Sequence, residues 1–501
     1  MRPPLIQHPR RSTPHRIRER GVTMALVALA MVAIIAMAGL SIDVGTLYQA
    51  SAEAQRAADA GALAAARTIS MQGLTGDPSN SSGAWSQICG GLSSLATVAA
   101  MTVVGQNPLS GASTNPNVTV SYSYSAGTPL TDCSSLASTG FGVNPQVTVV
   151  VQQANLPTYF SRIWGRTGNT VGATAMAEVF NSSNSNTYAA SGDTIPVQPR
   201  CVKPWIVPNY DPVNGCTGTG CLPLVNTASG TDGTIGRPGV SPAGVIGERI
   251  WLLAECSPTG SCTLTGPPLG AQPQANPTGS PYPTLSSLQY IPGQTSFQSI
   301  AVPSDGSAAC SAVTGNYAQA IAGCDQSTQY HCGVQSSSAT NPNQVNLGEN
   351  PVSSGDTTNG VECLIRQTVA YSTGGSPSGQ DTLAPFSLPP TYPFQIQAGS
   401  GNPLLNASPN AVPNNGLITS SNNIVSLPIY DSTNTIANNG STSPVTIVGF
   451  LQVFINVVDG NGNVYVTVLN VSGCGNGLTT TVSSSPLNGT SPVPVRLITP
   501  P

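Results

Sequence analysis

Basic side chains are scarce in this chain of 501 residues. Only 7% of the residues are charged, Lys203 is the single lysine, and the three histidines are His8, His15 and His331. A slightly acidic surface that is almost free of lysine offers no electrostatic footing to nucleic-acid phosphates, which excludes nucleic acid as a partner. Few general bases or imine-forming amines are left, so we expect no catalytic residue, no cofactor and no small-molecule substrate.

Cysteine is absent from the first 88 residues, and all twelve cysteines lie at or beyond Cys89. An even number of cysteines outside the cytoplasm is typical of disulfides. The candidate disulfide cysteines are Cys89 with Cys133, Cys216 with Cys221, and Cys256 with Cys262. Cys332 lies beside His331, and we expect it to pair with Cys310 or Cys324 rather than to form a nucleophilic or metal site. Spacing alone does not fix the connectivity.

One long uncharged run, VTMALVALAMVAIIAMAGLSI, contrasts with the polar remainder and covers residues 22–42. As a helix it would reach about 30 Å, the thickness of the hydrocarbon core of a bilayer. Six arginines precede it, and basic flanks stay on the cytoplasmic side. We therefore expect residues 1–21 to form a cytoplasmic basic tail, residues 22–42 a transmembrane helix, and the rest to be exported.

A cleaved secretory signal is the alternative interpretation of this run. The segment Ala36-Met37-Ala38 has the small-x-small pattern of a cleavage site. However, the apolar run is long for a signal, and the helical pattern continues without a breaker past residue 60. We therefore expect the span to be retained.

An alanine-rich extension follows the span in residues 43–69. Ten of the seventeen residues in 50–66 are alanine, the best helix former, so span and extension predict one helix of about 45 residues. A stripe of small side chains runs along one face, formed by Ala54, Ala58, Gly61 and Ala65. Small residues let another backbone approach closely. The stripe either receives a partner helix or packs against its own domain.

Strand patterns replace the helical period from about Val98 onward. Residues 118–124 alternate in polarity, and residues 146–152 and 170–179 are rich in residues that favour strands. With the long helix in front, residues 70–183 predict a pilin-like, strand-rich α+β domain.

The remainder, residues 184–501, predicts a β-rich exported domain with long loops. Glycine and proline together make up 97 residues of the chain, which favours many turns. The strongest hairpin is formed by residues 445–458 and 464–471, while Trp205 and Trp251 are candidate core anchors. The fold class is therefore α+β: a transmembrane helix extended into a long helix, a pilin-like domain, and a loop-rich β domain.

Two short segments imitate metal-binding motifs. Residues 77–81 spell D-x-S-x-S, but no buried apolar strand precedes them. Residues 459–463 imitate the start of an EF-hand loop, but Val464 stands where that loop needs glycine. We interpret the first as a loop that ends the helix and the second as a hairpin turn, so we expect no metal site.

Five segments carry a resemblance to a known family. They are RERG (18–21) before the span, GLSIDVG (39–45) at its outer end, AADAGALAAA (57–66) in the extension, and later FSRIWG (160–165) and VGATAMA (171–177). Together they resemble the TadE/TadG-like family of tight-adherence (Flp) pilus assembly. The resemblance covers roughly residues 16–180.

This resemblance implies a membrane-anchored structural or assembly component of a pilus that acts through protein–protein contacts. It places the chain in the bacterial inner membrane, with other pilus-assembly or pilin-like proteins as partners and its bulk periplasmic or surface-exposed. Gly21 becomes a candidate processing site, although Leu26 stands where type IV pilin precursors carry glutamate. A secreted or surface-displayed structural or adhesive protein without a pilus role is the alternative.

Overall fold

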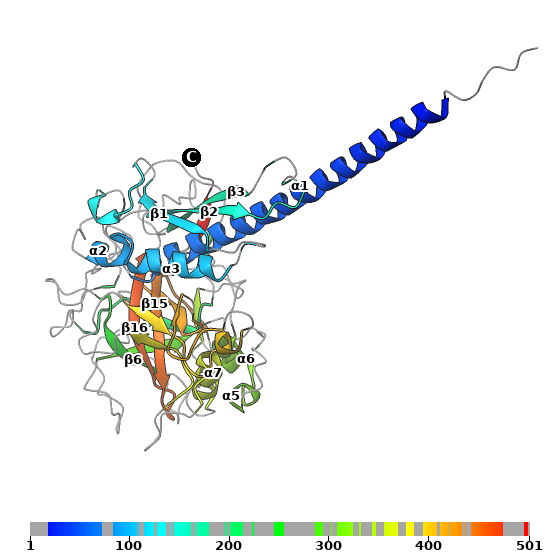
Figure 1. The fold of residues 1–501 in the computed structure, drawn as a ribbon. Coiled ribbons are helices and arrows are strands. Elements are labelled where there is room, and N and C mark those ends of the chain that lie inside the picture. The colour runs from blue at the N-terminus through cyan, green and yellow to red at the C-terminus, as the bar shows by residue number, and fades with distance from the viewer. Residues whose placement is uncertain are drawn as a thin grey trace, which may run out of the picture.

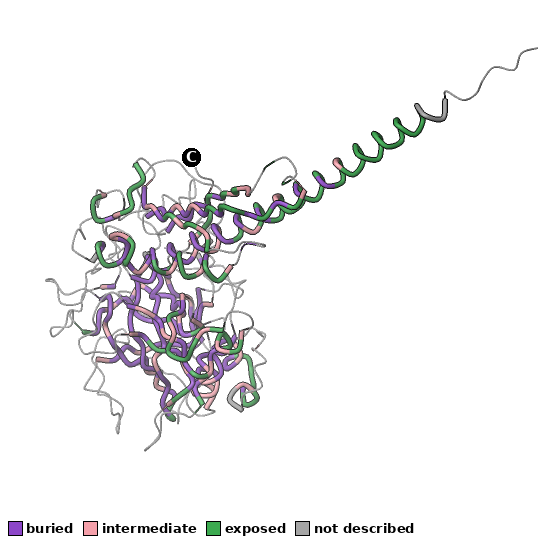
Figure 2. The backbone as a smooth tube through the Cα atoms, in the orientation of Figure 1, coloured by how far each residue is buried: buried purple, intermediate pink, exposed green. Residues whose placement is uncertain are grey.

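The first element is one uninterrupted helix, α1 (Glu19–Ser70), of 52 residues. It contains no proline, and alanine dominates its second half, so nothing in the sequence stops it before the turn at Met71 and Gln72. Figure 1 shows α1 projecting from the folded body as a straight rod. Its outer half is exposed along nearly its whole length, whereas its inner half is largely buried (Figure 2). The predicted long apolar helix is confirmed.

The structure of the protein is a computed structural model. The described residues are 19–72, 84–107, 109, 115–124, 128–136, 141, 145–160, 162, 165, 168–179, 196–197, 201–213, 223–224, 245–254, 286–293, 302, 308–323, 330–331, 343–346, 355–368, 377–384, 394–407, 411–419, 421–432, 436, 442–473 and 495–498.

A four-stranded antiparallel sheet packs against the inner half of α1. Its order is β1-β2-β3-β17, with β1 (Asn117–Ser123), β2 (Gln146–Leu156), β3 (Asn169–Val179) and β17 (Val495–Ile498). Alternate residues of β2, namely Val147, Val149 and Val151, are fully buried in the core that the sheet shares with α1. The strand predicted here from its strand-favouring residues is confirmed, and burial of every second residue is typical of a strand.

The last strand of this sheet comes from the far end of the chain. We assigned residues 184–501 to a separate β-rich domain, yet β17 pairs with β3, and the Arg496 guanidinium lies 2.9 Å from the Glu178 carboxylate. The sheet therefore draws on both ends of the chain, and the boundary at residue 184 does not hold for residues 495–498.

Two helices cover the other side of α1: α2 (Ala84–Cys89) and α3 (Leu95–Gly105). The strand prediction from Val98 was wrong here. Valine and threonine favour strands in the segment LATVAAMTVVG, but Ala96, Ala100 and Val104 recur every four residues and bury one helical face. Close packing on the small side chains of α1 outweighs the strand propensity.

A closed six-stranded barrel forms the second body of the molecule. Its order is β13-β15-β16-β6-β7-β5, made of β5 (Trp205–Pro208), β6 (Arg249–Ala254), β7 (Ser287–Pro292), β13 (Ile424–Tyr430), β15 (Ile447–Val458) and β16 (Val464–Gly473). The pairs β13·β5 and β6·β7 are parallel, and the other pairs are antiparallel. The predicted hairpin is the β15–β16 pair.

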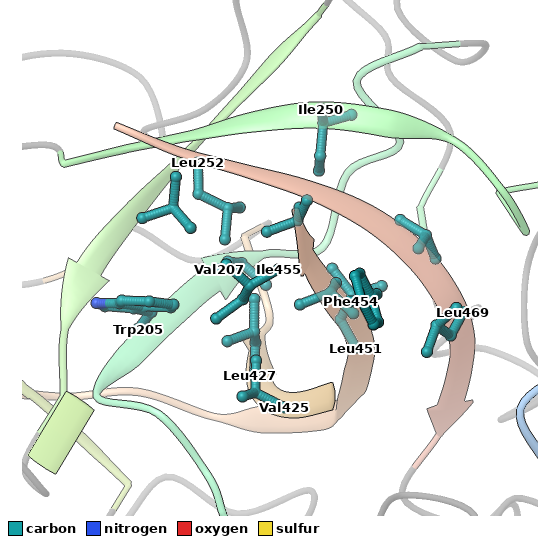
Figure 3. Close-up of a cluster of buried hydrophobic side chains, with 14 of the residues drawn as sticks. Trp205, Val207, Ile250, Leu252, Val425, Leu427, Leu451, Phe454, Ile455 and Leu469 are labelled. Atoms are coloured by element: carbon teal, nitrogen blue, oxygen red, sulfur yellow. The ribbon is translucent and has the colours of Figure 1, made fainter. Parts of the chain in front are cut away.

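Apolar side chains from all six barrel strands gather in its core, and Figure 3 labels residues of five of these strands. Those labelled in the figure are Trp205, Val207, Ile250, Leu252, Val425, Leu427, Leu451, Phe454, Ile455 and Leu469. Trp205 is fully buried here, and Trp251 is fully buried in a smaller cluster with Tyr465. The barrel is thus a packed core rather than a channel.

Shorter elements complete the two bodies, and all but one of them lie around the barrel. They are β4 (Pro196–Val197) paired with β8 (Tyr330–His331), β9 (Gln344–Asn346) paired with β14 (Thr442–Pro444), the sheet β10 (Thr382–Ala384), β11 (Gln395–Gln397) and β12 (Leu417–Ile418), and the helices α5 (Ala308–Ser311), α6 (Asn316–Ala322), α7 (Asp356–Ile365), η1 (Cys133–Ser135) and η5 (Pro403–Asn406). Of these, η1 belongs to the first body.

The inner half of α1, the four-stranded sheet, α2, α3 and η1 form the first body, which we also call the first domain. The two bodies meet where α1 ends. Met71 packs into the core of the barrel body, and the buried Gln72 amide both donates to the Phe394 carbonyl and accepts from its N–H group, each at 3.0 Å. Beside this contact lies a cleft of about 340 Å³ between α3 and β12. The end of α1 therefore fixes the barrel body to the first body through a narrow seam.

Candidate membrane-anchoring site

The outer half of α1 presents a largely exposed apolar surface. The large apolar side chains between Met24 and Val44 are exposed, whereas Gly39 and Asp43 are buried. By length and composition, the segment beginning at Thr23 is the one described helix that could cross a membrane. From Met24 to Val44 the helix rises about 30 Å, which matches a bilayer's hydrocarbon core.

At the end of this surface that lies nearest the folded body, one carboxylate binds a loop that is distant in the sequence. Asp43 is only 4% exposed, although the residues on either side of it are exposed and apolar. Its Oδ1 accepts the N–H group of Tyr159 at 2.9 Å, and its Oδ2 accepts the N–H group of Phe160 at 3.1 Å. A charged acceptor thus satisfies two backbone donors of the β2–β3 connection, an arrangement worth more than neutral hydrogen bonds.

One helical turn before Asp43, a glycine receives the same loop. Gly39 is buried, and a Cβ added there would lie 2.7 to 2.9 Å from Phe160 side-chain atoms. Only a residue without a side chain allows the phenyl ring to approach this closely. Gly39 and Asp43 therefore form one binding site for the loop, which we call the collar.

The path of the loop toward α1 depends on a bulge in β2. The register of β2 against β3 shifts between Gln153 and Leu156, and Asn155 has a φ of 60°. Asparagine tolerates this left-handed conformation better than most residues. Opposite it, Gly168 leaves room for the bulge, because an added Cβ would lie 3.1 Å from the Asn155 Cα. The bulge bends the hairpin end toward the helix.

Comparison with known proteins bears on this same helix. Residues 21–68 match the family model "Putative Flp pilus-assembly TadE/G-like". No curated protein and no solved structure matches the chain. The resemblance inferred from the sequence is confirmed for this segment, which holds both Gly39 and Asp43 and ends two residues before α1 does. Its collar partners Tyr159 and Phe160 lie outside the match.

The small-residue stripe of the TadE/G-like segment lies inside the protein. Ala54, Ala58 and Ala65 have no exposed surface and belong to the core shared with α3 and the sheet. Gly61 is buried, and a Cβ added there would lie 2.7 Å from the Val104 Cγ2 atom of α3. Of the two interpretations of the stripe, the structure places it in packing within its own domain.

The described cysteines are disulfide-bonded. Cys89 pairs with Cys133, as the sequence predicted, and joins α2 to η1. Cys310 pairs with Cys363 and joins α5 to α7, so of the two partners expected for Cys332, Cys310 or Cys324, the first is excluded. A helix pair brings Cys310 and Cys363 together across 53 residues, which local spacing does not reveal. Cys201 is also disulfide-bonded. The other candidates, Cys216, Cys221, Cys256, Cys262 and Cys324, lie outside the described residues.

The EF-hand-like segment is a hairpin turn between β15 and β16, as predicted. Asp459 Oδ1 accepts the N–H groups of Asn461 and Asn463 at 2.9 and 2.8 Å, and its Oδ2 accepts the Asn463 amide at 2.8 Å. The turn's own donors thus occupy the carboxylate. Within the described residues, no group of three or more His, Cys, Asp or Glu could hold a metal ion. The D-x-S-x-S segment lies outside those residues, as does Cys332 beside His331.

Buried hydroxyl groups support the two cores. Burial raises the pKa of Tyr122 to about 12, and its hydroxyl lies 2.7 Å from the Thr97 hydroxyl of α3. In the barrel body, burial also raises the pKa of Tyr290 and of Tyr317, whose hydroxyl accepts from Trp205 Nε1 at 3.1 Å. All three phenols stay protonated at physiological pH and hold elements together by hydrogen bonds.

Removing the Asp43 carboxylate should release the loop from the collar. Because hydrogen bonds to a charged group contribute about 1.5–3 kcal/mol, Asp43→Ala should speed trypsin cleavage at Arg162 in detergent-solubilised protein by about tenfold or more. Asp43→Asn keeps one acceptor oxygen and should fall in between. Asp59→Ala is the matched control, since Asp59 on the same helix accepts an exposed Gln55 amide. Equal cleavage rates in Asp43→Ala and Asp59→Ala would show that the carboxylate does not hold the loop.

Proposed function

We propose that this chain is a membrane-anchored structural or assembly component of a bacterial tight-adherence (Flp) pilus and acts through protein–protein contacts. Its N-terminus lies in the cytoplasm, α1 crosses the inner membrane once, and the two folded bodies stand in the periplasm or at the surface. Six arginines before the span support this orientation, because basic flanks stay inside.

The observation that carries the proposal is the double use of the TadE/G-like segment. Residues 21–68 provide the exposed apolar half of α1 and also the alanine-rich half that the first domain packs around. One helix therefore joins the membrane to a folded domain without an intervening linker. A displacement of the domain is transmitted to the span, as an anchor or initiator of a surface filament requires.

The structure of the first domain supports a role in assembly, because its sheet and short helices pack around one long helix. This arrangement of a long N-terminal helix against an antiparallel sheet supports the proposal that the domain is pilin-like. The barrel body, fixed at Gln72 and Phe394, would then be the part that reaches farthest from the helix toward partners (Figure 1).

Deletion of the gene in its host should abolish surface pili or sharply reduce their number, as counted by electron microscopy. The full chain supplied in trans should restore them. A chain that lacks residues 1–38 but is exported by an unrelated cleaved signal keeps Gly39 and should fold, yet it should fail to restore them, because the anchor is missing. Wild-type pilus numbers in the deletion strain would instead favour a displayed adhesive protein with no pilus role.

A further inference from the structure

We propose that residues 157–160, at the start of the β2–β3 connection, are embedded in the interfacial region of the bilayer's outer leaflet and seat the first domain directly on the membrane. This inference relies on the membrane anchoring in the proposed function. It goes beyond it, because it makes the domain itself a lipid-binding surface.

The height of the collar along α1 is the first argument. The exposed apolar surface continues past Gly39, through Leu40 and Ile42 to Val44. Phe160 packs on Gly39, which lies about 7.5 Å closer to the membrane centre than Val44 when the helix rises 1.5 Å per residue. If lipid covers the exposed side chains up to Val44, then Phe160, at the height of Gly39, is surrounded by lipid as well.

The backbone of the loop is prepared for such surroundings. An extended segment that enters the membrane interface loses water from its N–H groups, and each unsatisfied group is costly there. Asp43 accepts two of these groups, from Tyr159 and Phe160, while its own carbonyl accepts the Thr46 hydroxyl at 2.9 Å. A buried carboxylate beside an apolar span is thereby explained by the donors that it satisfies.

The exposed side chains at this level have the character of a membrane interface. Tyr159 is 59% exposed and Tyr48 on α1 is 74% exposed, and tyrosine is enriched where a protein meets the headgroups. Arg162 lies two residues beyond Phe160 and is exposed, so its guanidinium can reach lipid phosphates. An aromatic residue on the helix and another on the loop thus support the same bilayer level.

The inference can be tested by placing a tryptophan within residues 157–160. Tyr159→Trp would be reconstituted as the full chain in vesicles of phosphatidylethanolamine and phosphatidylglycerol whose acyl chains carry bromine near the glycerol end. The wild-type fluorescence is subtracted, because four native tryptophans contribute to every sample. Tyr48→Trp calibrates the headgroup level. Tyr124→Trp is the matched control, because this half-buried tyrosine follows β1 at the end of the sheet away from the collar.

Brominated lipid should quench the added fluorescence of Tyr159→Trp strongly and leave that of Tyr124→Trp almost unchanged. Quenching of Tyr159→Trp no greater than that of Tyr124→Trp would overturn the inference and leave the loop to contact water or a partner protein. Failure of the chain to float with the vesicles would contradict the membrane anchoring itself. If Tyr159→Trp does not fold, cross-linking of wild-type residues 157–160 by a photoactivatable lipid gives the same decision.

Discussion

Replacing Gly61 with leucine is expected to destabilise the first domain strongly while the chain still inserts into the membrane. A Cβ at this position would lie 2.7 Å from Val104 Cγ2, 3.4 Å from the Ala100 carbonyl oxygen and 3.5 Å from Val149 Cγ1. Leucine at such a site meets α3 on one side and β2 on the other. Overpacking of a core costs about 1–3 kcal/mol, and the larger figure applies where backbone limits relaxation.

The substitution changes helix propensity and packing in opposite directions, so the sign of the stability change identifies its cause. Leucine favours a helix over glycine by nearly 1 kcal/mol, so any loss of stability must come from packing. Gly45→Leu is the matched control, because nothing lies within 4 Å of a Cβ added to Gly45 on the same helix. Thermal unfolding of the solubilised full chain should show a large loss for Gly61→Leu and none for Gly45→Leu. Equal stability of the two variants would contradict the packing of α1 against α3.

Removing the Cys89–Cys133 disulfide is expected to destabilise the first domain by about 4 kcal/mol, the loop-closure contribution for a 44-residue separation. Both cysteines are buried in the core around α1, so the double variant Cys89→Ala/Cys133→Ala leaves no odd thiol and little new polar surface. The effect should appear as a lower denaturant midpoint for protection of the first domain from proteolysis.

The second disulfide provides a control within the same chain. Cys310→Ala/Cys363→Ala removes a similar loop, of 53 residues, from helices beside the barrel. It should weaken the packing of α5 against α7 and leave the denaturant midpoint of the first domain nearly unchanged. A first-domain midpoint that does not move when Cys89 and Cys133 are replaced would show that the bridge contributes nothing to that domain.

Sequence patterns predicted the elements that are built from local order. The apolar run and the alanine period give α1, alternation gives β1, and strand-favouring residues give β2 and β3. Local patterns misled where packing outweighed propensity, as in α3, whose valines and threonines suggested a strand. They also missed β13, because Pro428 interrupts its apolar run, although the structure pairs Pro428 with Phe450 in the barrel.

The collar and strand β17 depend on contacts between distant parts of the chain, which no local sequence pattern indicates. The Asp43 carboxylate meets backbone groups 116 and 117 residues away, and backbone donors leave no trace in a sequence. The nearest signal was the recurrence of GLSIDVG and FSRIWG in the family resemblance, which marked both segments without indicating that they touch. Likewise, the four residues of β17 find β3 only through the fold.

The small-residue stripe shows the same limit in another form. Ala58 and Ala65 at helical spacing suit a partner helix as well as the chain's own sheet, and only the fold decides between them. Because both are fully buried, leucine at these positions should disrupt the domain rather than detach a partner alone.

Mass spectrometry of the intact protein purified from the cell envelope tests the central claim, that α1 anchors the folded bodies in the membrane, most directly. The mass should include residues 22–42, whether the chain begins at Met1 or is processed after Gly21, and the protein should fractionate with membranes. A mature protein that begins at Gly39, after Ala36-Met37-Ala38, and fractionates as soluble material would contradict the claim.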